Sequence, residues 1–437
     1  MSVFVTGRLA LLTGLGVVPV VLLSAAGVDA WLVAGCWLLL CAAPAVADVA
    51  AAGDPERLRV DRRLPSRARL GERVETHLWL TNEGSRRVRG LVRDAWQPTA
   101  GPPEQRMPVD VPPGERRRVD VPLRPRRRGE RTSGFIVVRA TGPLGLAGRQ
   151  ARIDAHGAVR VLPPFTARRH LPSRVARLRE LDGSTSVQVR GQGTEFDSLR
   201  EYVRGDDVRS IDWRATARAG STMLRTWRPE RDRHVVILVD TGRTAAARVG
   251  DGVRLDAAME AALLLAALAG RAGDHVHLVM YDRVVRARVT GVDGPALLPA
   301  LVDAMAPVEA QLIDTDWDGA FAQVRGLTSR PSLVVVLTAQ DSVESARGFL
   351  GSLGLVARGA RLVVGTVTDT ALDDLIAARS TAEEVHRAAA AERTLRDAEE
   401  VAGAVARAGG DAIAAGPDGL APRIADRYLE LKAAGRL

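Results

Sequence analysis

Two long apolar stretches open the chain. Residues 9–28 carry no charged side chain, and after Asp29 a second apolar stretch covers residues 30–47. A helix of about 20 residues rises about 30 Å, the thickness of the hydrocarbon core of a bilayer. The second stretch follows at once, without a polar mature start, which argues against a secretory signal. The pattern predicts a transmembrane helical hairpin within residues 1–53.

Short alternating runs replace the long apolar stretches in residues 54–163. They are separated by turn-forming Asn, Pro and Gly, which is typical of β-strands. The runs cover residues 74–80, 88–92, 119–123, 135–140 and 159–162. We expect a small β-sandwich here. The prolines at 108–113 favour turns or a sheet edge over a central strand.

Strands and helices alternate in residues 231–437. The strand runs are apolar on both faces, as parallel strands covered by helices require. They cover residues 234–240, 275–282, 332–338, 361–367 and 412–415. Helical periodicity marks residues 256–271, 295–305, 316–325, 342–353, 381–408 and 420–432. The whole chain is therefore expected to be multidomain, ending in a doubly wound α/β domain with residues 284–289 as an antiparallel edge strand.

A connecting segment, residues 164–230, joins the two predicted domains. Residues 164–192 are basic and loosely patterned. Next we expect a helix at 196–203, a tight turn on Gly205 with Asp206 and Asp207, a second helix at 208–219 and a strand at 222–227. Charges of both signs alternate through this part, so it is either a dense Arg–carboxylate network or a solvated helical hairpin with weak surface ion pairs.

The net charge of +9 is placed unevenly. Residues 57–131 hold 20 Arg against 10 Asp and Glu. Such a region could bind nucleic acid, anionic lipid or an acidic partner. Its position beside the apolar stretches favours membrane lipids over nucleic acid. The two cysteines, Cys36 and Cys41, lie in the second apolar stretch and form no disulfide framework.

Charge also orients the hairpin. Arg8 precedes the first span, whereas the turn between the spans carries only Asp29. The arginines after the second span are Arg57, Arg59, Arg62, Arg63, Arg67 and Arg69. By the positive-inside rule we expect a two-span membrane protein with both termini and the soluble domains in the cytoplasm, and we expect these arginines to face anionic headgroups.

The connecting segment resembles a known signature. The resemblance rests on Arg200, Glu201, Tyr202, Gly205, Asp206, Asp207, Arg209, Asp212 and Trp213. Together these residues are similar to the signature of domain-of-unknown-function family 58, a bacterial family that couples this motif to a von Willebrand factor A-like domain. The resemblance implies a binding role for these residues and a MoxR-type AAA+ ATPase as partner. The family has no settled activity. Where it usually has Asp before the proline of a Gly-Pro-Leu-Gly-Leu turn, this chain has Gly142.

The end of the first α/β strand resembles a metal-ion-dependent adhesion motif, Asp-x-Ser-x-Ser. Asp240 and Thr244 match, Gly242 replaces the middle hydroxyl, and the distant Thr of the motif falls near Thr315. The later Asp is missing, because Asp341 comes two positions late. With two ligands lost, we expect a degenerate site at Asp240, Thr244 and Thr315 that binds Mg²⁺ weakly at most. The alternative is that Asp240 caps a turn. His275 and His277 share one strand face, where a structural role is favoured over a metal pair.

Three functions remain open from the sequence. The favoured one is a membrane-anchored, non-enzymatic protein-interaction module that acts with a MoxR-type ATPase in assembly or maturation of other proteins or of the cell envelope. A metal-dependent hydrolase would use the carboxylates of Asp206, Asp207, Asp212 and Asp240, although the neighbouring arginines would hold them as ion pairs. A nucleic-acid-binding protein would use the Arg-rich domain. No cofactor is expected for the favoured function.

Overall fold

The computed structural model divides the chain into two compact units, Met1–Leu162 and Pro163–Leu437. It describes residues 2–104, 106–188, 195–203, 208–228, 233–250, 252–328, 330–340 and 342–437. Of the residues singled out above, Gly205, Asp206, Asp207 and Asp341 lie outside these ranges.

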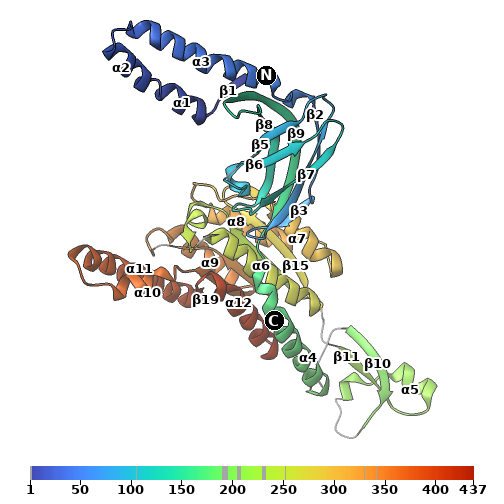
Figure 1. Cartoon of the computed structure of the whole chain (residues 1–437). Helices are drawn as coiled ribbons and strands as arrows, with labels where there is room; N and C mark the ends of the chain where they lie inside the picture. The colour runs from blue at the N-terminus through green and yellow to red at the C-terminus, as the bar shows by residue number, and fades with distance from the viewer. Residues whose placement is uncertain are drawn as a thin grey trace. The chain divides into compact units, whose positions relative to one another are not determined.

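The first unit begins with apolar helices that project from a β-domain (Figure 1). Its helices are α1 (Gly7–Gly14), α2 (Val17–Ala25) and α3 (Ala30–Ala51), preceded by strand β1 (Ser2–Val5). Both expected apolar segments are present: Gly7–Ala25 with 19 residues and Ala30–Arg57 with 28 are long and apolar enough to cross a membrane. Helices α1 and α2 lie beside α3, whose first turn is capped by Asp29.

The β-domain contains two sheets that share one core. Its strands are β2 (Leu58–Arg63), β3 (Arg67–Arg69), β4 (Val74–Asn82), β5 (Val88–Trp96), β6 (Met107–Val111), β7 (Arg116–Leu123), β8 (Gly129–Thr141) and β9 (Ala147–Leu162). One sheet has the order β1-β9-β8-β5-β6 with β3 beside β9, and the other has the order β2-β4-β7. Alternate residues of both sheets, such as Leu78 and Val138, are fully buried in one cluster. The five expected strands are confirmed, and β6, which contains Pro108, is an edge strand as expected.

One arginine of the expected headgroup cluster is buried instead. Arg62 lies inside the β-domain, where its guanidinium makes two hydrogen bonds to Asp94, of 2.6 and 2.9 Å. It also donates to Ser133 Oγ and to the Ala155 carbonyl. Asp94 is 32 residues away in sequence and can compensate the charge only after the sheets have formed. The expectation that Arg62 faces lipid is therefore wrong.

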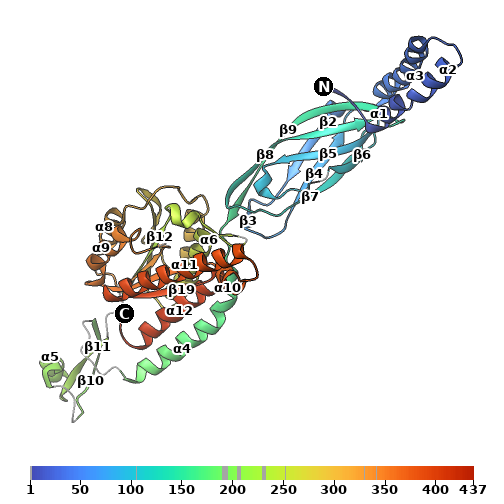
Figure 2. The same cartoon turned by 90° about the vertical axis from the view of Figure 1, so that its left-hand side faces the viewer.

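The second unit contains a six-stranded sheet with helices on both faces (Figure 2). Its strands are β12 (His234–Asp240), β15 (His275–Tyr281), β16 (Val285–Val289), β17 (Leu333–Leu337), β18 (Arg361–Val367) and β19 (Gly410–Ala415). The order is β16-β15-β12-β17-β18-β19, and every pairing is parallel except that of β16 with β15. The expected antiparallel edge strand is thus confirmed, within one residue.

The helices of this unit cover the sheet from two sides. They are α6 (Arg254–Arg271), α7 (Leu297–Met305), α8 (Trp317–Leu327), α9 (Arg347–Ala357), α10 (Ala371–Ala377), α11 (Ala382–Arg407) and α12 (Pro417–Ala433). Phe321 of α8 and Phe349 of α9 are fully buried with alternate residues of β12, β15, β17 and β18. Helices α6 and α12 pack together and contact the sheet. Helix α10 lies where no helix was expected.

The connecting segment differs from the expectation in two places. Residues 171–188, for which the sequence predicted neither a helix nor a strand, form α4 (Leu171–Gln188). Arg174 of this helix pairs with Asp426 of α12 at 2.7 Å. The expected helix at 196–203 is wrong: Glu195–Glu201 is strand β10, antiparallel to β11 (Met223–Arg228). Of the second expected helix, only α5 (Trp213–Ala219) is α-helical, after a 3₁₀ turn at Val208–Ser210. The expected strand at 222–227 is confirmed as β11.

Candidate functional site

Strand β12 brings Asp240 to the carboxyl edge of the parallel sheet, where ligands bind in such sheets. The side chain is 3% exposed. Its Oδ1 accepts hydrogen bonds from Thr315 Oγ1 at 2.5 Å and from the Gly242 amide at 2.8 Å. Its Oδ2 accepts from Thr338 Oγ1 at 2.7 Å and from Thr244 Oγ1 at 3.4 Å. The structure therefore brings together Asp240, Thr244 and Thr315, and adds Thr338.

The glycine at position 242 creates the space that Thr315 uses. A Cβ on Gly242 would lie 2.3 Å from Thr315 Oγ1 and 2.9 Å from the Ile313 carbonyl oxygen. A serine here, as the adhesion motif has, would thus displace the hydroxyl that bonds Asp240. The hydrogen bond from Thr315 to Asp240 therefore depends on a glycine, in place of the serine of the motif, at position 242.

Thr338 was not among the residues predicted from the sequence. It follows β17 directly and is 7% exposed. Besides its bond to Asp240, its hydroxyl accepts from Gln340 Nε2 at 2.9 Å. The available signal was a hydroxyl residue placed immediately after a buried strand that neighbours β12. The adhesion motif has a carboxylate near this position, so its pattern does not indicate a hydroxyl there.

Burial raises the pKa of Asp240 above its usual value, and this effect outweighs the hydrogen bonds from Thr315, Thr338, Gly242 and Thr244, which act in the opposite direction. All four donors are uncharged. Among the described residues, the carboxyl group is therefore held by neutral hydroxyls and one backbone amide, without a cationic side chain.

The donor set fits a hard divalent cation poorly. Mg²⁺ in proteins is bound through one or two carboxylates with several waters, in near-octahedral geometry. Here both oxygens of the one carboxylate already accept hydrogen bonds, and the cavity beside Asp240, Thr338 and Gly365 measures about 10 Å³. Such a volume is at the lower limit for one water molecule. In the part of the chain that the structure describes, no group of three or more His, Cys, Asp or Glu could hold a metal ion.

A second carboxylate, Asp282, lies at the end of the neighbouring strand and is held differently. It is fully buried and accepts from Arg286 Nε at 2.6 Å, from Thr241 Oγ1 at 3.0 Å and from the amides of Arg283 and Val284. Burial by itself raises the pKa of Asp282, but the hydrogen bonds, first that of Arg286, outweigh it and lower the pKa. Two adjacent strand ends thus carry buried carboxyl groups whose pKa values move in opposite directions.

The described residues of the family-58 signature form a small hairpin. Tyr202 donates its backbone amide to the Thr222 carbonyl at 2.8 Å, and Glu201 accepts from Ser221 Oγ at 2.8 Å. Arg200 donates to the carbonyl of Glu201. Arg209 lies exposed on the 3₁₀ turn before α5. Glu201, Arg209 and Trp213 are exposed, whereas Arg200, Tyr202 and Asp212 are partly buried.

Asp212 links the short helix of this hairpin to its second strand. Its Oδ1 caps α5 by accepting from the Arg214 and Ala215 amides at 3.0 Å, and its Oδ2 accepts from Arg225 at 2.5 Å. The Arg225 hydrogen bond and the two amides lower the pKa of Asp212. Trp213, the next residue, is 70% exposed.

The carboxylates required by the hydrolase hypothesis are not assembled by the described residues. Asp206 and Asp207 lie outside them. Asp212 caps α5, Asp240 ends β12, and the two share no hydrogen-bond partner within the described ranges. Asp212, with its lowered pKa and three donors, is also a poor general base.

The histidines at the amino ends of β12 and β15 form a small cluster. His277 lies 2.9 Å from His234 through Nε2 and Nδ1, and His275 bonds Asp293 at 3.0 Å. The ring of His234 stacks on both neighbours. His234 was missed from the sequence, because only the parallel register, which pairs it with His275, brings it within reach of His277.

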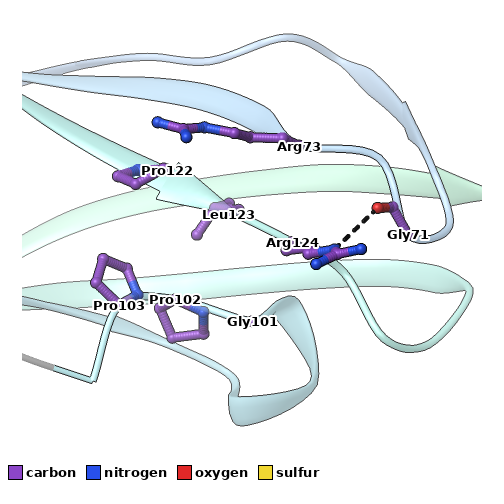
Figure 3. Close-up of a pocket in the computed structure, with 8 residues that line it drawn as sticks. All are labelled: Gly71, Arg73, Gly101, Pro102, Pro103, Pro122, Leu123 and Arg124. Carbon is purple, nitrogen blue, oxygen red and sulfur yellow. Dashed lines mark hydrogen bonds between the residues drawn. The ribbon is translucent and has the colours of Figure 1, made fainter.

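A larger pocket lies in the β-domain, between the loop that joins β3 to β4 and the end of β7 (Figure 3). Its volume is about 450 Å³. Its lining residues are Gly71, Arg73, Gly101, Pro102, Pro103, Pro122, Leu123 and Arg124. Arg124 donates to the Gly71 carbonyl at 3.2 Å, and Arg73 pairs with Glu75. None of the residues predicted to bind a ligand lines this pocket.

Solved structures similar to parts of the chain give no functional guidance. The solution NMR structure of the CARDB domain of PF1109 from Pyrococcus furiosus is 16% identical, covers 24% of this chain and 94% of its own, and has a TM-score of 0.18. The crystal structure of the same domain in complex with di-metal ions is 17% identical, covers 24% of this chain and 86% of its own, and has a TM-score of 0.17. AvmM, which catalyses macrocyclization in alchivemycin A biosynthesis, is 16% identical, covers 24% of this chain and 89% of its own, and has a TM-score of 0.17. These TM-scores support no argument about this chain.

No curated protein matches the sequence. A family model does match, over residues 198–390, which begin in β10 at the signature hairpin, include Asp240 and its hydroxyl partners, and end in α11. This part of the chain matches the family described as "Protein of unknown function DUF58".

Proposed function

We propose that the protein is a membrane-anchored, non-enzymatic interaction module that docks a protein partner through the signature hairpin. The main observation in support of this proposal is that the hairpin combines exposed apolar side chains with charged side chains held in place by hydrogen bonds. Trp213 is 70% exposed, and Val203 and Val208 are each 62% exposed. Exposed aromatic and aliphatic side chains among charged neighbours are typical of protein-binding surfaces.

The hairpin is also built to keep these side chains in place. Asp212 caps the short helix α5 that begins at Trp213, and Arg225 of β11 holds Asp212 in turn. Such preorganisation reduces the entropy lost on binding. The charged signature residues therefore support the binding surface, and none of them needs to act on a substrate.

We further propose that the α/β unit is a von Willebrand factor A-like head with a degenerate metal-ion-dependent adhesion site. The strand order and the position of Asp240 at the end of β12 support this assignment. The Asp240 carboxyl has four donors of its own and only about 10 Å³ of open space beside it. Small-molecule sites are typically of several hundred Å³. The head thus recognises other proteins and carries out no reaction at this edge.

The first unit supports the proposed membrane topology. Strand β1 precedes the first apolar helix and pairs with β9 of the β-domain, to which the second helix also leads. This pairing supports placing the N-terminus and the β-domain on one side of the bilayer, which the arginine distribution assigns to the cytoplasm. The partner we propose is a MoxR-type AAA+ ATPase, acting in assembly or maturation of other proteins or of the cell envelope.

The test is a binding measurement between the purified full chain in detergent and the purified MoxR-type ATPase of the same genome, with and without ATP. We expect binding that Trp213→Ala weakens at least tenfold, since interface tryptophans contribute about 2 kcal/mol or more. Leu312→Ala is the matched control, because Leu312 is 79% exposed but lies outside the hairpin. Equal loss in both variants, or no binding at all, would overturn the proposed partner.

A further inference from the structure

The ends of both apolar segments meet at the turn between β8 and β9. Before the first helix, Thr6 Oγ1 donates to the carbonyls of Gly145 and Leu146, at 2.8 and 3.0 Å. Near the end of the second helix, the carboxylate of Asp48 accepts from the amides of Leu144, Leu146 and Ala147, at 2.7, 2.7 and 3.0 Å. The turn is therefore fixed against both segments at the point where they leave the apolar region.

Arginines surround this junction and are not neutralised there. The guanidinium groups of Arg149 and Arg86 donate to the carbonyls of Val49 and Ala50 at the end of α3, the Arg149 bond being 3.0 Å. Arg8 lies exposed in the first turn of α1. Within the described ranges, none of the three pairs with a carboxylate, and the Asp48 carboxylate is already satisfied by amides. A guanidinium has five N–H donors, so Arg86 and Arg149 keep most of theirs available.

The neighbouring charges differ from these three. Arg87 is paired with Asp110 in two hydrogen bonds, and Arg57 lies 3.8 Å from Asp54. Arg67 and Arg69 lie on β3, whose backbone pairs with β9 so that they are opposite Arg160 and Leu162. Positions 149 and 160 of this strand are about 36 Å apart at about 3.3 Å per residue. The arginines that follow the second span in sequence therefore do not form one patch at the membrane.

We propose that Arg8, Arg86 and Arg149 form a collar that binds the phosphate groups of anionic glycerophospholipids. Planar guanidinium forks suit phosphate oxygens. Apolar side chains lie in the same region: Leu144 at the tip of the turn is 55% exposed, and Val3 and Val5 of β1 are 58% and 65% exposed. Side chains of this kind enter the headgroup layer together with cationic ones. Their presence favours a membrane surface over a soluble phosphate.

The collar rests on the proposed membrane insertion, and the experiment separates the two. The full chain is reconstituted in nanodiscs of phosphatidylcholine mixed with phosphatidylglycerol, and the lipids that stay bound on transfer to detergent are counted by native mass spectrometry. We compare the wild type with the triple variant Arg8→Gln, Arg86→Gln, Arg149→Gln. Glutamine keeps an N–H donor for the helix carbonyls but removes the charge. The control is Arg73→Gln, Arg117→Gln, Arg118→Gln, three exposed arginines of which the first lies in the loop before β4 and the other two on β7.

We expect the wild type and the control to retain phosphatidylglycerol preferentially and the collar variant to lose that preference, by about fivefold for each arginine removed. Equal retention of both lipids by wild type, while the chain still resists carbonate extraction from membranes, would overturn the collar and leave insertion intact. Extraction by carbonate would overturn insertion itself. If inorganic phosphate displaces the lipid at equal concentration, the collar is a phosphate site and the lipid proposal is wrong.

Discussion

Thr338 Oγ1 donates a 2.7 Å hydrogen bond to Asp240 Oδ2 at the carboxyl edge of the sheet. A neutral hydroxyl thus contacts the carboxyl group at the position where a metal-binding head would have a second acid. The neutrality of this hydroxyl matters for the protonation of Asp240, because none of the described residues that donate a hydrogen bond to this buried carboxyl group carries a positive charge. This relationship predicts an unusual dependence of stability on pH.

The first prediction concerns Asp240→Asn. The folded protein keeps the Asp240 proton at pH values where the unfolded chain has released it, because the folded pKa is raised. This contribution to stability is fully present below the unfolded pKa, about 3.9, and is lost as the pH rises through the folded pKa. Asparagine cannot ionise, so we expect the variant to gain thermal stability relative to wild type as the pH rises. Thermal unfolding of the full chain in detergent across pH measures this.

Asp282 supplies an internal check on the sign. Its folded pKa is lowered, so its contribution is present above the unfolded pKa and is lost as the pH falls through the folded value. Asp240→Asn should therefore leave the acid-induced loss unchanged. If divalent ions instead raise the wild-type unfolding midpoint and fail to do so in Asp240→Asn, the carboxyl is a metal ligand and the prediction is wrong.

The second prediction concerns Gly242→Ser, which would restore the missing hydroxyl of the adhesion motif. Since the new Cβ would lie 2.3 Å from Thr315 Oγ1, we expect a loss of about 1–3 kcal/mol in the free energy of unfolding. Thr315→Ala removes the clashing atom, so its cost in the Gly242→Ser background should be smaller than in wild type. A double-mutant cycle by denaturant unfolding measures the coupling. Additive costs would show that the two positions are independent.

The third prediction concerns the glycine that faces Asp48. A Cβ on Gly142 would lie 2.1 Å from Asp48 Oδ1, so Gly142→Ala must displace the carboxylate from the turn amides. We expect a cost of about 1–3 kcal/mol. Gly134→Ala is the control, because Gly134 lies in β8, the strand that leads into this turn, and a Cβ there meets no atom within 4 Å. Hydrogen exchange of the Leu144, Leu146 and Ala147 amides should rise in the first variant alone. Unchanged exchange would contradict the contact.

The sequence predicted the parallel strands well because their apolar runs are buried on both faces. It failed at the signature hairpin for an identifiable reason. Phe196, Leu199 and Val203 recur at helical spacing, but pairing of β10 with β11 decides the structure of this segment. A partner 22 to 33 residues away is invisible to a local pattern.

The candidate site shows the same division between residues that a local motif indicates and residues that only strand pairing brings together. Asp240 and Thr244 could be found because the motif is local, and Thr315 because the family resemblance suggested it. Only the parallel register brings Thr338 beside Asp240 and, at the other end of β12, His234 beside His275. Arg62 was assigned to the membrane surface because it lies in a cluster of arginines, whereas its position is decided by Asp94 on another strand. Charge counts predict the local excess but not which charges are compensated.

The last prediction concerns the break between α1 and α2, which lies within an apolar segment. At this break the Gly16 amide bonds to Thr13 O at 3.1 Å, so the carbonyl of Leu12 loses its usual helical donor. Trp37 of α3 replaces it, with Nε1 donating to Leu12 O at 3.1 Å. A Cβ on Gly16 would lie 2.3 Å from the Trp37 ring, so glycine admits the indole. In lipid, a backbone carbonyl without a donor is costly.

We therefore expect Trp37→Phe to destabilise the helix pair by roughly 1 kcal/mol, the usual scale for a hydrogen bond between membrane helices. Trp31→Phe is the matched control, since Trp31 lies on the same helix and is 87% exposed. The unfolding midpoint of the full chain in detergent should fall in the first variant and stay constant in the second. Gly16→Ala should reproduce the loss, because it excludes the indole, and adding Trp37→Phe to it should cost little more. Independent, additive losses would mean that Trp37 stabilises the pair by packing alone.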